Sequence, residues 1–447
     1  MIDWVILGKF AIGLVFAALV LLLVRHPYVQ SMSPSRFGLF TILWAISTRL
    51  GVYLVLYIVL GMSTQSDVPA YYYPQALDAI QGKLVYRDFY SSYGPLFPYI
   101  LAEIVKIWND PRAIVLFSII VELGSLPIWM TVARRAVGEK MARVSMLLYL
   151  LSPISFYNVV ILGTNQVWVS LFLAMAMFAL LKRHWVFSAL LMAASLLAVK
   201  VLVLIFVPVF ALGTLQCCNN PKWFAWSVVK NSKAAVLYIL AFSLPVGVTS
   251  VWLFAHQANP LSPIIFEGQQ ISSGNLPYLI SAIGLSPYGS VGTILMGFCA
   301  VALSVLLIWS MCKQAGRRPT ALLALLAGVL CIFMILSKKA FCTYLTMAAF
   351  PLCMTVVMIP ARLRALIMFS LLGVLTIIES SMWFRWVKQA DLSAVFNGGV
   401  PLTQGTIFLS VEIALIICYG YFLGQTIRQV RGGAGQEDAR TAHVDAL

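Results

Sequence analysis

The sequence predicts an all-α integral membrane protein, a polytopic bundle of transmembrane helices. Of its 447 residues, 61% are hydrophobic and only 10% are charged, whereas soluble domains carry about 25% charged residues. Apolar runs of about 18 or more residues recur along the whole chain, and each is long enough to cross a bilayer as a helix. No stretch is long and polar enough to form a separate soluble domain, so residues 1–427 are expected to form one transmembrane domain. Residues 428–447 are polar and glycine-rich and are expected to be a disordered cytoplasmic tail.

The candidate membrane spans are apolar segments separated by short polar loops. They are residues 4–24, 37–61, 112–132, 144–160, 164–181, 186–214, 234–256, 289–312, 320–337, 341–360, 365–385 and 404–424. The first segment lacks the basic start and small-residue cleavage site of a signal peptide, so it is expected to be a retained helix. The apolar run 95–108 is left out because about 14 residues extend only about 21 Å as a helix, less than the bilayer core. It is expected to be a re-entrant or juxtamembrane helix at the outer face.

Lysine and arginine cluster in the short loops between spans, which is how membrane proteins place their basic loops in the cytoplasm. This pattern explains the net charge of +15 without nucleic acid. All basic loops fall on one side only if residues 186–214, with Lys200 at their middle, cross an even number of times. A broken hairpin with Lys200 near the outer face satisfies this condition, whereas one long helix with a buried lysine does not. The hairpin is favoured, and it gives about 13 crossings with the N-terminus outside and the C-terminus inside.

The outer loop between the second and third spans, residues 62–111, holds the densest group of reactive side chains. Carboxylates, an arginine and seven tyrosines gather in the stretch from Ser66 to Tyr99. Val68 to Ile80 has the spacing of an amphipathic helix that lies along the membrane interface, where tyrosines settle. Gly82 is expected to end this helix, and Gly94-Pro95 to begin a second short one.

A purely structural explanation exists for some of these residues. Charged side chains at an interface can extend toward water, and carboxylates can cap helices. This explanation suits Asp78 and Lys83. It is weaker for Asp67 and Asp88, because aromatic belts do not require acids beside them.

The loop follows a longer pattern: an aspartate after an early span, then tyrosines and an alanine-rich surface helix, then G-x-x-x-Y-R-D-F-x-x-x-Y-G-P-L. The residues that carry it are Asp67, Tyr71, Ala76, Gly82, Tyr86, Arg87, Asp88, Phe89, Tyr93, Gly94, Pro95 and Leu96. This pattern resembles the first outer loop of polyprenyl-phosphate-dependent glycosyltransferases of the GT-C superfold, and is most similar to bacterial mannosyltransferase-type members. Weaker matches follow at Ser152-Pro153, at the Gly163–Gln166 turn and at Ser337-Lys338-Lys339. Relatives often carry an acid shortly after the glutamine of the turn, whereas Gln166 is followed by valine and tryptophan.

The resemblance implies transfer of a sugar, a hexose such as mannose, from a polyprenyl-phosphate donor to a glycan or lipid acceptor. The reaction would invert the anomeric carbon at the outer face of a bacterial cytoplasmic membrane. A base must accept the acceptor hydroxyl's proton, and cations must hold the lipid phosphate. Asp67 is the first candidate for the base and Asp88 the second. The candidates for the phosphate are Arg87, Lys200, Lys338 and Lys339, and those for substrate contacts are Tyr71, Tyr72, Tyr90, Tyr93 and Gln166. Some relatives use a divalent cation, but no ligand cluster in this sequence demands one.

Charged residues within spans are costly and are often functional. Lys200 is the clearest example. Arg49 is expected either to face the cavity or, preferably, to pair with Glu122. Glu379 and Glu412 are expected to be helix-packing or cavity residues rather than catalytic ones.

Other classes of protein are compatible with part of these observations. A transporter or flippase of lipid-linked sugars would line its path with intramembrane charges, but it would also be expected to show inverted repeats, and none is convincing here. An O-antigen ligase or polymerase would be expected to have a large late outer loop with arginine and histidine, and residues 257–288 contain no arginine. A scaffold subunit would not need the acids of the first outer loop.

Overall fold

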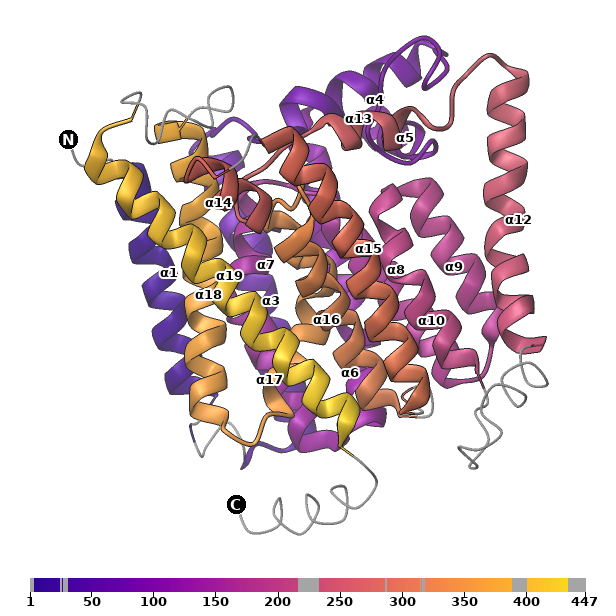
Figure 1. The fold of residues 1–447 in the computed structure, drawn as a ribbon. Helices are drawn as coiled ribbons and strands as arrows, with labels where there is room; N and C mark the ends of the chain where they lie inside the picture. The colour runs from indigo at the N-terminus through magenta and orange to yellow at the C-terminus, as the bar shows by residue number, and fades with distance from the viewer. Residues whose placement is uncertain are drawn as a thin grey trace.

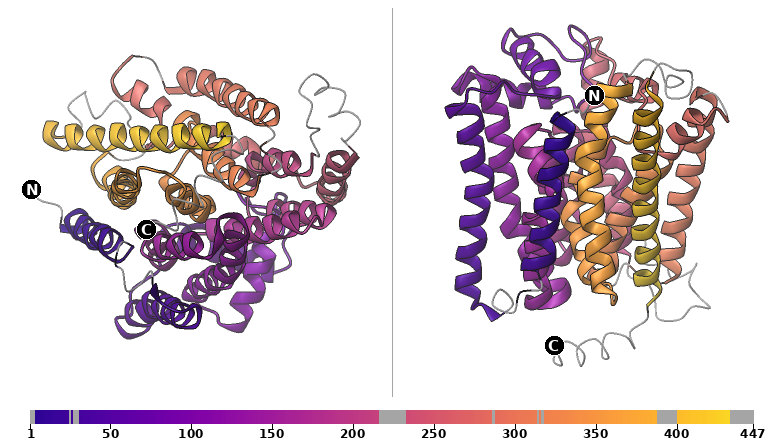
Figure 2. Two further views of the ribbon diagram at one scale, coloured as in Figure 1. Left: turned by 90° about the horizontal axis from the view of Figure 1, so that it is seen from below. Right: turned by 90° about the vertical axis from the view of Figure 1, so that its left-hand side faces the viewer.

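The computed structural model describes residues 4–24, 26, 31–215, 233–285, 288–313, 315, 318–387 and 400–432. Within these residues the regular structure is helical apart from one isolated bridge between Val85 and Phe89. Long helices run along a common direction, and the short helices α4, α5, α13 and α14 lie at one end of the bundle (Figure 1). Figure 2 shows the same bundle from below and from the side. The predicted all-α class is confirmed.

The α-helices are α1 (Trp4–Leu23), α3 (Pro34–Ile46), α4 (Tyr73–Ile80), α5 (Phe97–Ile107), α6 (Pro111–Leu150), α7 (Pro153–Phe156), α8 (Gln166–Leu181), α9 (Trp185–Ala198), α10 (Val207–Thr214), α12 (Lys233–Ala255), α13 (Ser262–Gln269), α14 (Leu276–Ala282), α15 (Tyr288–Cys312), α16 (Pro319–Leu336), α17 (Ala349–Val357), α18 (Arg362–Met382) and α19 (Leu402–Arg431). Shorter 3₁₀ and π segments are η1 (Ser47–Gly51), η2 (Leu54–Val59), η3 (Val68–Tyr72), η4 (Tyr157–Ile161), η5 (Val201–Ile205), η8 (Cys342–Ala348) and η9 (Trp383–Val387).

Eight helices in the described part of the chain are long and apolar enough to cross a membrane, and four shorter apolar helices accompany them. The chain is therefore a polytopic helical membrane protein. The count of about 13 crossings and the orientation stay predictions. Helix α19 continues to Arg431, so residues 428–431 of the expected tail are helical. Residues 433–447 and most of the loop expected at 386–403 lie outside the described residues.

Helix α6 is a hairpin rather than a rod. Gly138 interrupts it with a φ of 79°, a left-handed conformation that glycine adopts without steric cost. The hydroxyl of Tyr149 donates to Oε1 of Glu122, 3.0 Å away and 27 residues earlier. In a straight helix these residues would lie about 40 Å apart. The turn at Gly138 thus brings the two predicted spans, 112–132 and 144–160, side by side.

The break predicted at Lys200 is present. Helix α9 ends at Ala198, Val199 and Lys200 leave helical geometry, and η5 begins at Val201. The chain then returns along the bundle: a side chain added at Gly213 would meet Leu180, at the far end of α8. The run is therefore a hairpin with Lys200 at its turn, as the distribution of basic loops predicts.

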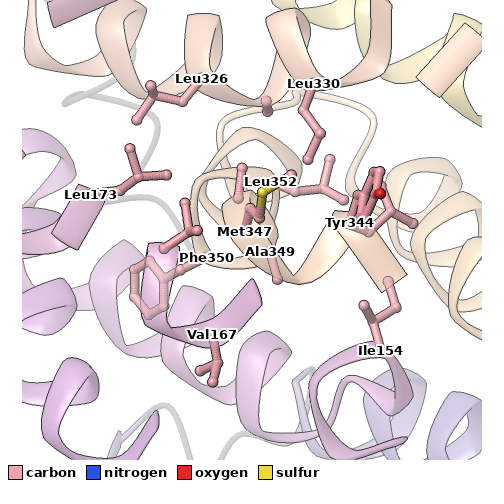
Figure 3. Close-up of a cluster of buried hydrophobic side chains, with 14 of the residues drawn as sticks. Ile154, Val167, Leu173, Leu326, Leu330, Tyr344, Met347, Ala349, Phe350 and Leu352 are labelled. Carbon is pink, nitrogen blue, oxygen red and sulfur yellow. The ribbon is translucent and has the colours of Figure 1, made fainter. Parts of the chain in front are cut away.

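The core of the bundle is a continuous apolar cluster between α8, α16, α17 and the segments that flank them. Figure 3 shows Val167 and Leu173 of α8 facing Phe350 and Leu352 of α17, with Leu326 and Leu330 of α16 beyond them. Tyr344 of η8 lies at the edge of this cluster. Its hydroxyl reaches the functional site described below, so close packing of the core fixes the position of one polar group there.

The predicted pairing of Arg49 with Glu122 is confirmed. Nε of Arg49 lies 3.1 Å from Oε2 of Glu122, and both side chains are buried. Nη2 of Arg49 also donates to the hydroxyl of Ser155. A buried ion pair with further hydrogen bonds is satisfied within the bundle, which accounts for Arg49 structurally.

The first outer loop forms two amphipathic helices, as predicted. Val68, Tyr72, Gln75 and Ala76 are buried on one face of the continuous η3–α4 helix. Their spacing of i, i+4, i+7 and i+8 is that of a single helical stripe. Helix α5 buries Phe97, Leu101 and Val105 in the same way. The two helices pack on each other and on the bundle, so the loop between them is held against one end of the bundle.

Candidate functional site

Segments that are far apart in the sequence meet beside Asp67, at the end of the bundle that carries α4 and α5 (Figure 1). They are the first outer loop, the Gly163–Gln166 turn, the turn at Lys200 and the segment that contains Tyr344. Hydrogen bonds or ring contacts, described below, join these segments to one another. The loops that the charge pattern assigns to one side of the membrane thus build one site.

Asp67 begins the η3 helix and is half-buried. Its Oδ2 accepts a hydrogen bond from the hydroxyl of Tyr93, 3.0 Å away. The ring of Tyr93 packs edge-on against Tyr72, with 5.0 Å between centroids, and against Phe97 at 4.9 Å. Because this aromatic packing fixes the ring, the hydroxyl of Tyr93 holds the carboxylate of Asp67 in one orientation.

Tyr72 ties the same cluster to α8. Its buried hydroxyl accepts from the backbone N–H of Asn165, 3.2 Å away. Burial, and then the nearby Asp67 carboxylate, raise the pKa values of Tyr72 and Tyr93 well above the usual value. Both tyrosines therefore stay protonated, and Asp67 is the proton acceptor of the cluster.

Lys200 supplies a buried cation over the ring of Tyr93. Its Nζ donates to the hydroxyl of Tyr344 at 3.2 Å. It also lies 4.5 Å from the centroid of the Tyr344 ring and 5.6 Å from that of Tyr93. Cation–π contacts of this kind contribute about 0.5–2 kcal/mol each. They hold the ammonium group without neutralising its charge, which leaves it able to attract an anion.

Gly94 allows the first outer loop to approach Lys200 closely. Its N–H donates to the carbonyl oxygen of Val199 at 3.0 Å, and the N–H of Leu96 donates to Leu197 at 2.9 Å. A Cβ at Gly94 would lie only 2.3 Å from the carbonyl oxygen of Leu197. Only glycine fits this contact, which sets Tyr93 against the turn at Lys200.

Arg87 and Asp88 form a different, exposed unit. Nε and Nη2 of Arg87 donate to the two carboxylate oxygens of Asp88 at 2.8 and 2.9 Å. The N–H of Leu84 donates to Asp88 as well, at 2.6 Å. The Arg87 guanidinium, followed by the Leu84 amide, lowers the pKa of Asp88 to about 2. A carboxylate with so low a pKa is a weak base, and the partners of Asp88 suit the alternative role of orienting Arg87.

The remaining predicted residues divide between the surface and the interior. Tyr71 and Tyr90 are exposed, and the Tyr90 ring lies 4.4 Å from Phe266 of α13. Lys339 lies near the same phenylalanine, with Nζ 5.9 Å from its centroid. The backbone carbonyl of Lys338 accepts from Ser272. Lys338 and Lys339 thus belong with Tyr90 and α13, and neither makes a described contact with Lys200.

Gln166 is buried at the start of α8, and its Oε1 has no hydrogen-bond partner within the described structure. The side-chain amide of Asn165 is buried beside it and is also unpartnered. Sequence analysis did not single out Asn165 or Phe266. The only signal for Asn165 is its place in the Gly163–Gln166 turn. Two buried amides without partners beside Tyr72 suit contacts to the hydroxyl groups of a sugar.

The donor set does not suit a metal ion as a resident cofactor. In the part of the chain that the structure describes, no three histidine, cysteine, aspartate or glutamate side chains converge. The neighbours of Asp67 are tyrosine hydroxyls, which leaves a divalent cation short of carboxylate ligands. We therefore derive no step through a metal ion.

No protein-family model matches this chain, and no curated protein matches its sequence. Its structure is similar to the crystal structure of the oligosaccharyltransferase of Archaeoglobus fulgidus in its apo form, with a TM-score of 0.39 and 11% sequence identity. The match covers 92% of this chain and 57% of that one, so this chain spans little more than half the length of the archaeal protein. A TM-score this low does not establish a shared family, and function has to be inferred from the residues of this chain.

Proposed function

We propose that this protein is an inverting membrane glycosyltransferase. It moves a sugar, a hexose such as mannose, from a polyprenyl-phosphate donor to a glycan or lipid acceptor. The site lies at the outer face of a membrane, which we take to be the bacterial cytoplasmic membrane. The observation that carries the proposal is that one side chain, Tyr93, contacts both a carboxylate, Asp67, through its hydroxyl and a buried cation, Lys200, over its ring.

These groups fit the two needs of the reaction. The acceptor hydroxyl attacks the anomeric carbon, its proton passes to Asp67, and the bond from that carbon to the phosphate oxygen breaks. A general base of this kind contributes about 10²–10⁴-fold to the rate. The electron pair of the broken bond stays on the lipid phosphate, where Lys200 offsets the charge. Tyr93 orients the base, and the Asn165 and Gln166 amides bind the sugar.

We infer that the entrance to the site lies at Tyr90 and Phe266, whose rings are in contact and near which Lys339 lies. The ion pair Arg87–Asp88 precedes Tyr90 in the same loop. Arg87 is exposed and Lys338 and Lys339 are half-buried, which suits them to the first capture of a phosphate from the membrane surface. Tyr71, also exposed, would contact the acceptor. Lys200, which is buried, would bind the phosphate during the reaction.

An apolar groove offers a place for the hydrocarbon chain of the donor. It has a volume of about 270 Å³ and lies between the first outer loop, at Leu84–Val85 and Pro95–Leu96, and four residues of α12, namely Val248, Thr249, Trp252 and Leu253. Pro95 is two residues from Tyr93, so the groove begins next to the reacting groups. Its walls on α12 include the exposed side chains of Val248 and Trp252, which face the surroundings of the bundle. An isoprenoid chain could therefore enter from the bilayer.

The test is sugar transfer in proteoliposomes with radiolabelled polyprenyl-phosphate hexoses and a panel of acceptors. We expect label to move from lipid to acceptor with the wild type, and Asp67→Asn to abolish transfer while it largely keeps donor binding. Asp78→Asn is the matched control, because Asp78 lies in the same loop but pairs with Lys83 at the surface. Near-full activity of Asp67→Asn would contradict the assignment of the base. If no donor is consumed and labelled lipid instead crosses the bilayer, the protein is a flippase.

A further inference from the structure

Two buried carboxylates outside the catalytic cluster converge on one short segment. Glu379 of α18 accepts a hydrogen bond from the hydroxyl of Ser273, and Glu412 of α19 accepts one from the backbone N–H of Gly274. The side chains are 3% and 0% exposed. Ser273 and Gly274 are consecutive residues in the connection between α13 and α14, so the two carboxyl groups lie next to each other.

The pair differs from the other buried acid of the bundle. Glu122 is neutralised by Arg49, whereas neither Glu379 nor Glu412 forms an ion pair among the described residues. The titratable groups that face the pair are Cys342, whose sulfur lies 3.7 Å from the hydroxyl of Tyr419, and Cys331 behind that tyrosine. None of them supplies positive charge. Two adjacent ionised carboxylates in an apolar interior repel each other and lack solvation, so at least one keeps its proton at neutral pH.

The segment that the pair holds is connected to the entrance of the candidate site. The N–H of Ser272 donates to the carbonyl oxygen of Lys338 at 3.0 Å, and the N–H of Ala340 donates to the hydroxyl of Ser272 at 2.7 Å. The side chain of Asn275 braces the segment from within, through a bond to the carbonyl oxygen of Ser272 at 2.8 Å. Hydrogen bonds on either side of the short backbone segment Ser272–Gly274 therefore link the two glutamates to the backbone that carries Lys338 and Lys339.

We propose that Glu379 and Glu412 are positioning residues that share a proton and fasten Ser272–Asn275, and through it Lys338–Ala340, to helices α18 and α19. With the proton present, the pair carries one negative charge and accepts both hydrogen bonds. Loss of the proton adds a second charge, and mutual repulsion loosens the segment. The part of this inference that concerns phosphate affinity rests on the proposed function, whereas the fastening of the segment does not.

The experiment compares the wild type with Glu412→Gln, Glu379→Gln and Glu412→Ala, with Ser410→Ala as the matched control. Ser410 is exposed on the same helix and bonds only to the backbone of its own helix at Thr406. The first readout is modification of Cys342 by a membrane-permeable maleimide at neutral pH, measured by mass spectrometry. The second is the affinity for polyprenyl phosphate without a sugar, measured as a function of pH. Cys342 is buried beside Gly274, so its modification reports release of the segment.

Each glutamine variant should protect Cys342 and bind the lipid phosphate as the wild type does at neutral pH, because glutamine accepts the hydrogen bond and donates to the remaining carboxylate. The wild type should lose affinity as the pH rises, and the glutamine variants should lack the part of this fall that comes from the shared proton. Glu412→Ala should expose Cys342 and weaken binding about tenfold, as expected for one charge-assisted hydrogen bond.

If the affinity of Glu412→Gln for polyprenyl phosphate falls with rising pH as much as that of the wild type, the two glutamates do not share a proton. If Cys342 stays protected from the maleimide in Glu412→Ala, Glu412 does not hold the segment Ser272–Asn275 in place. If Glu412→Ala cannot be purified in a folded state, the glutamine variants still decide: modification of Cys342 in both of them would overturn the proposal. If the wild type binds no polyprenyl phosphate, the proposed function fails, while the modification of Cys342 still tests the role of the pair.

Discussion

The hydroxyl of Tyr93 donates a hydrogen bond to Asp67 across 3.0 Å, from a position 26 residues later in the same outer loop. The face of the same ring lies toward the ammonium group of Lys200. One aromatic side chain thus contacts both the proposed base, Asp67, and the proposed phosphate-binding cation, Lys200. The arrangement lets the protein keep opposite charges close without an ion pair that would neutralise them.

Loss of the Tyr93 hydroxyl should slow transfer without unfolding the protein. Tyr93→Phe keeps the ring packing but releases Asp67, and hydrogen bonds to charged groups contribute about 1.5–3 kcal/mol. We expect kcat to fall about 10- to 100-fold with little change in KM, measured by steady-state transfer kinetics. Tyr73→Phe is the control, because the Tyr73 hydroxyl bonds to Asn109 at the surface. Equal kinetics for the two variants would refute the positioning role of Tyr93.

Removal of the Lys200 charge should affect donor binding and stability in opposite directions. Lys200→Met keeps the apolar stem but removes a buried cation whose desolvation is costly. The melting temperature in detergent should stay the same or rise, whereas affinity for polyprenyl phosphate should fall about 10- to 100-fold. Lys106→Gln, which breaks an exposed pair with Glu103, should change neither. A Lys200→Met protein that binds the lipid phosphate normally would remove Lys200 from the site.

The pKa of Asp88 leads to a prediction about pH dependence. With a pKa lowered to about 2, Asp88 stays ionised at neutral and mildly acidic pH. Its protonation, and any loss of the Arg87 pair, would begin only as the pH falls toward 2. Asp88→Asn should therefore change the magnitude of kcat/KM but leave the shape of its pH profile unchanged. A shifted acidic limb in the variant would show that Asp88, rather than Asp67, is the titrating base.

The groove beside α12 can be tested with donors of different chain length. Val248 and Val251 are both exposed on α12, at 62% and 69%, but only Val248 lines the groove. Val248→Trp should fill the groove and raise KM for long polyprenyl donors about tenfold, with a smaller effect on a short-chain analogue. Val251→Trp should leave KM unchanged for both the long-chain and the short-chain donor. An equal effect of the two substitutions on both donors would indicate a general disturbance at the membrane surface.

Much of the architecture follows from the sequence because it depends on local composition and spacing. The long apolar runs require helices in a bilayer, since every backbone polar group must find an internal partner there. The stripe from Val68 to Ala76 determines an amphipathic helix, and a lysine in the middle of residues 186–214 indicates a break. The pairing of Arg49 with Glu122 could be predicted from the sequence, because the two residues carry opposite charges and lie in neighbouring spans.

Only the tertiary structure decided which of the clustered side chains meet. Seven tyrosines in one loop are equivalent in sequence, yet the hydroxyl of Tyr93 donates to Asp67, because Gly94 packs against the carbonyl of Leu197. Glu379 and Glu412, which sequence analysis treated as separate helix-packing residues, converge on Ser273 and Gly274 through the packing of α18 and α19. Local patterns determine which face of a helix is apolar, but contacts between residues a hundred positions apart depend on how whole helices pack, and that information is spread over the entire core.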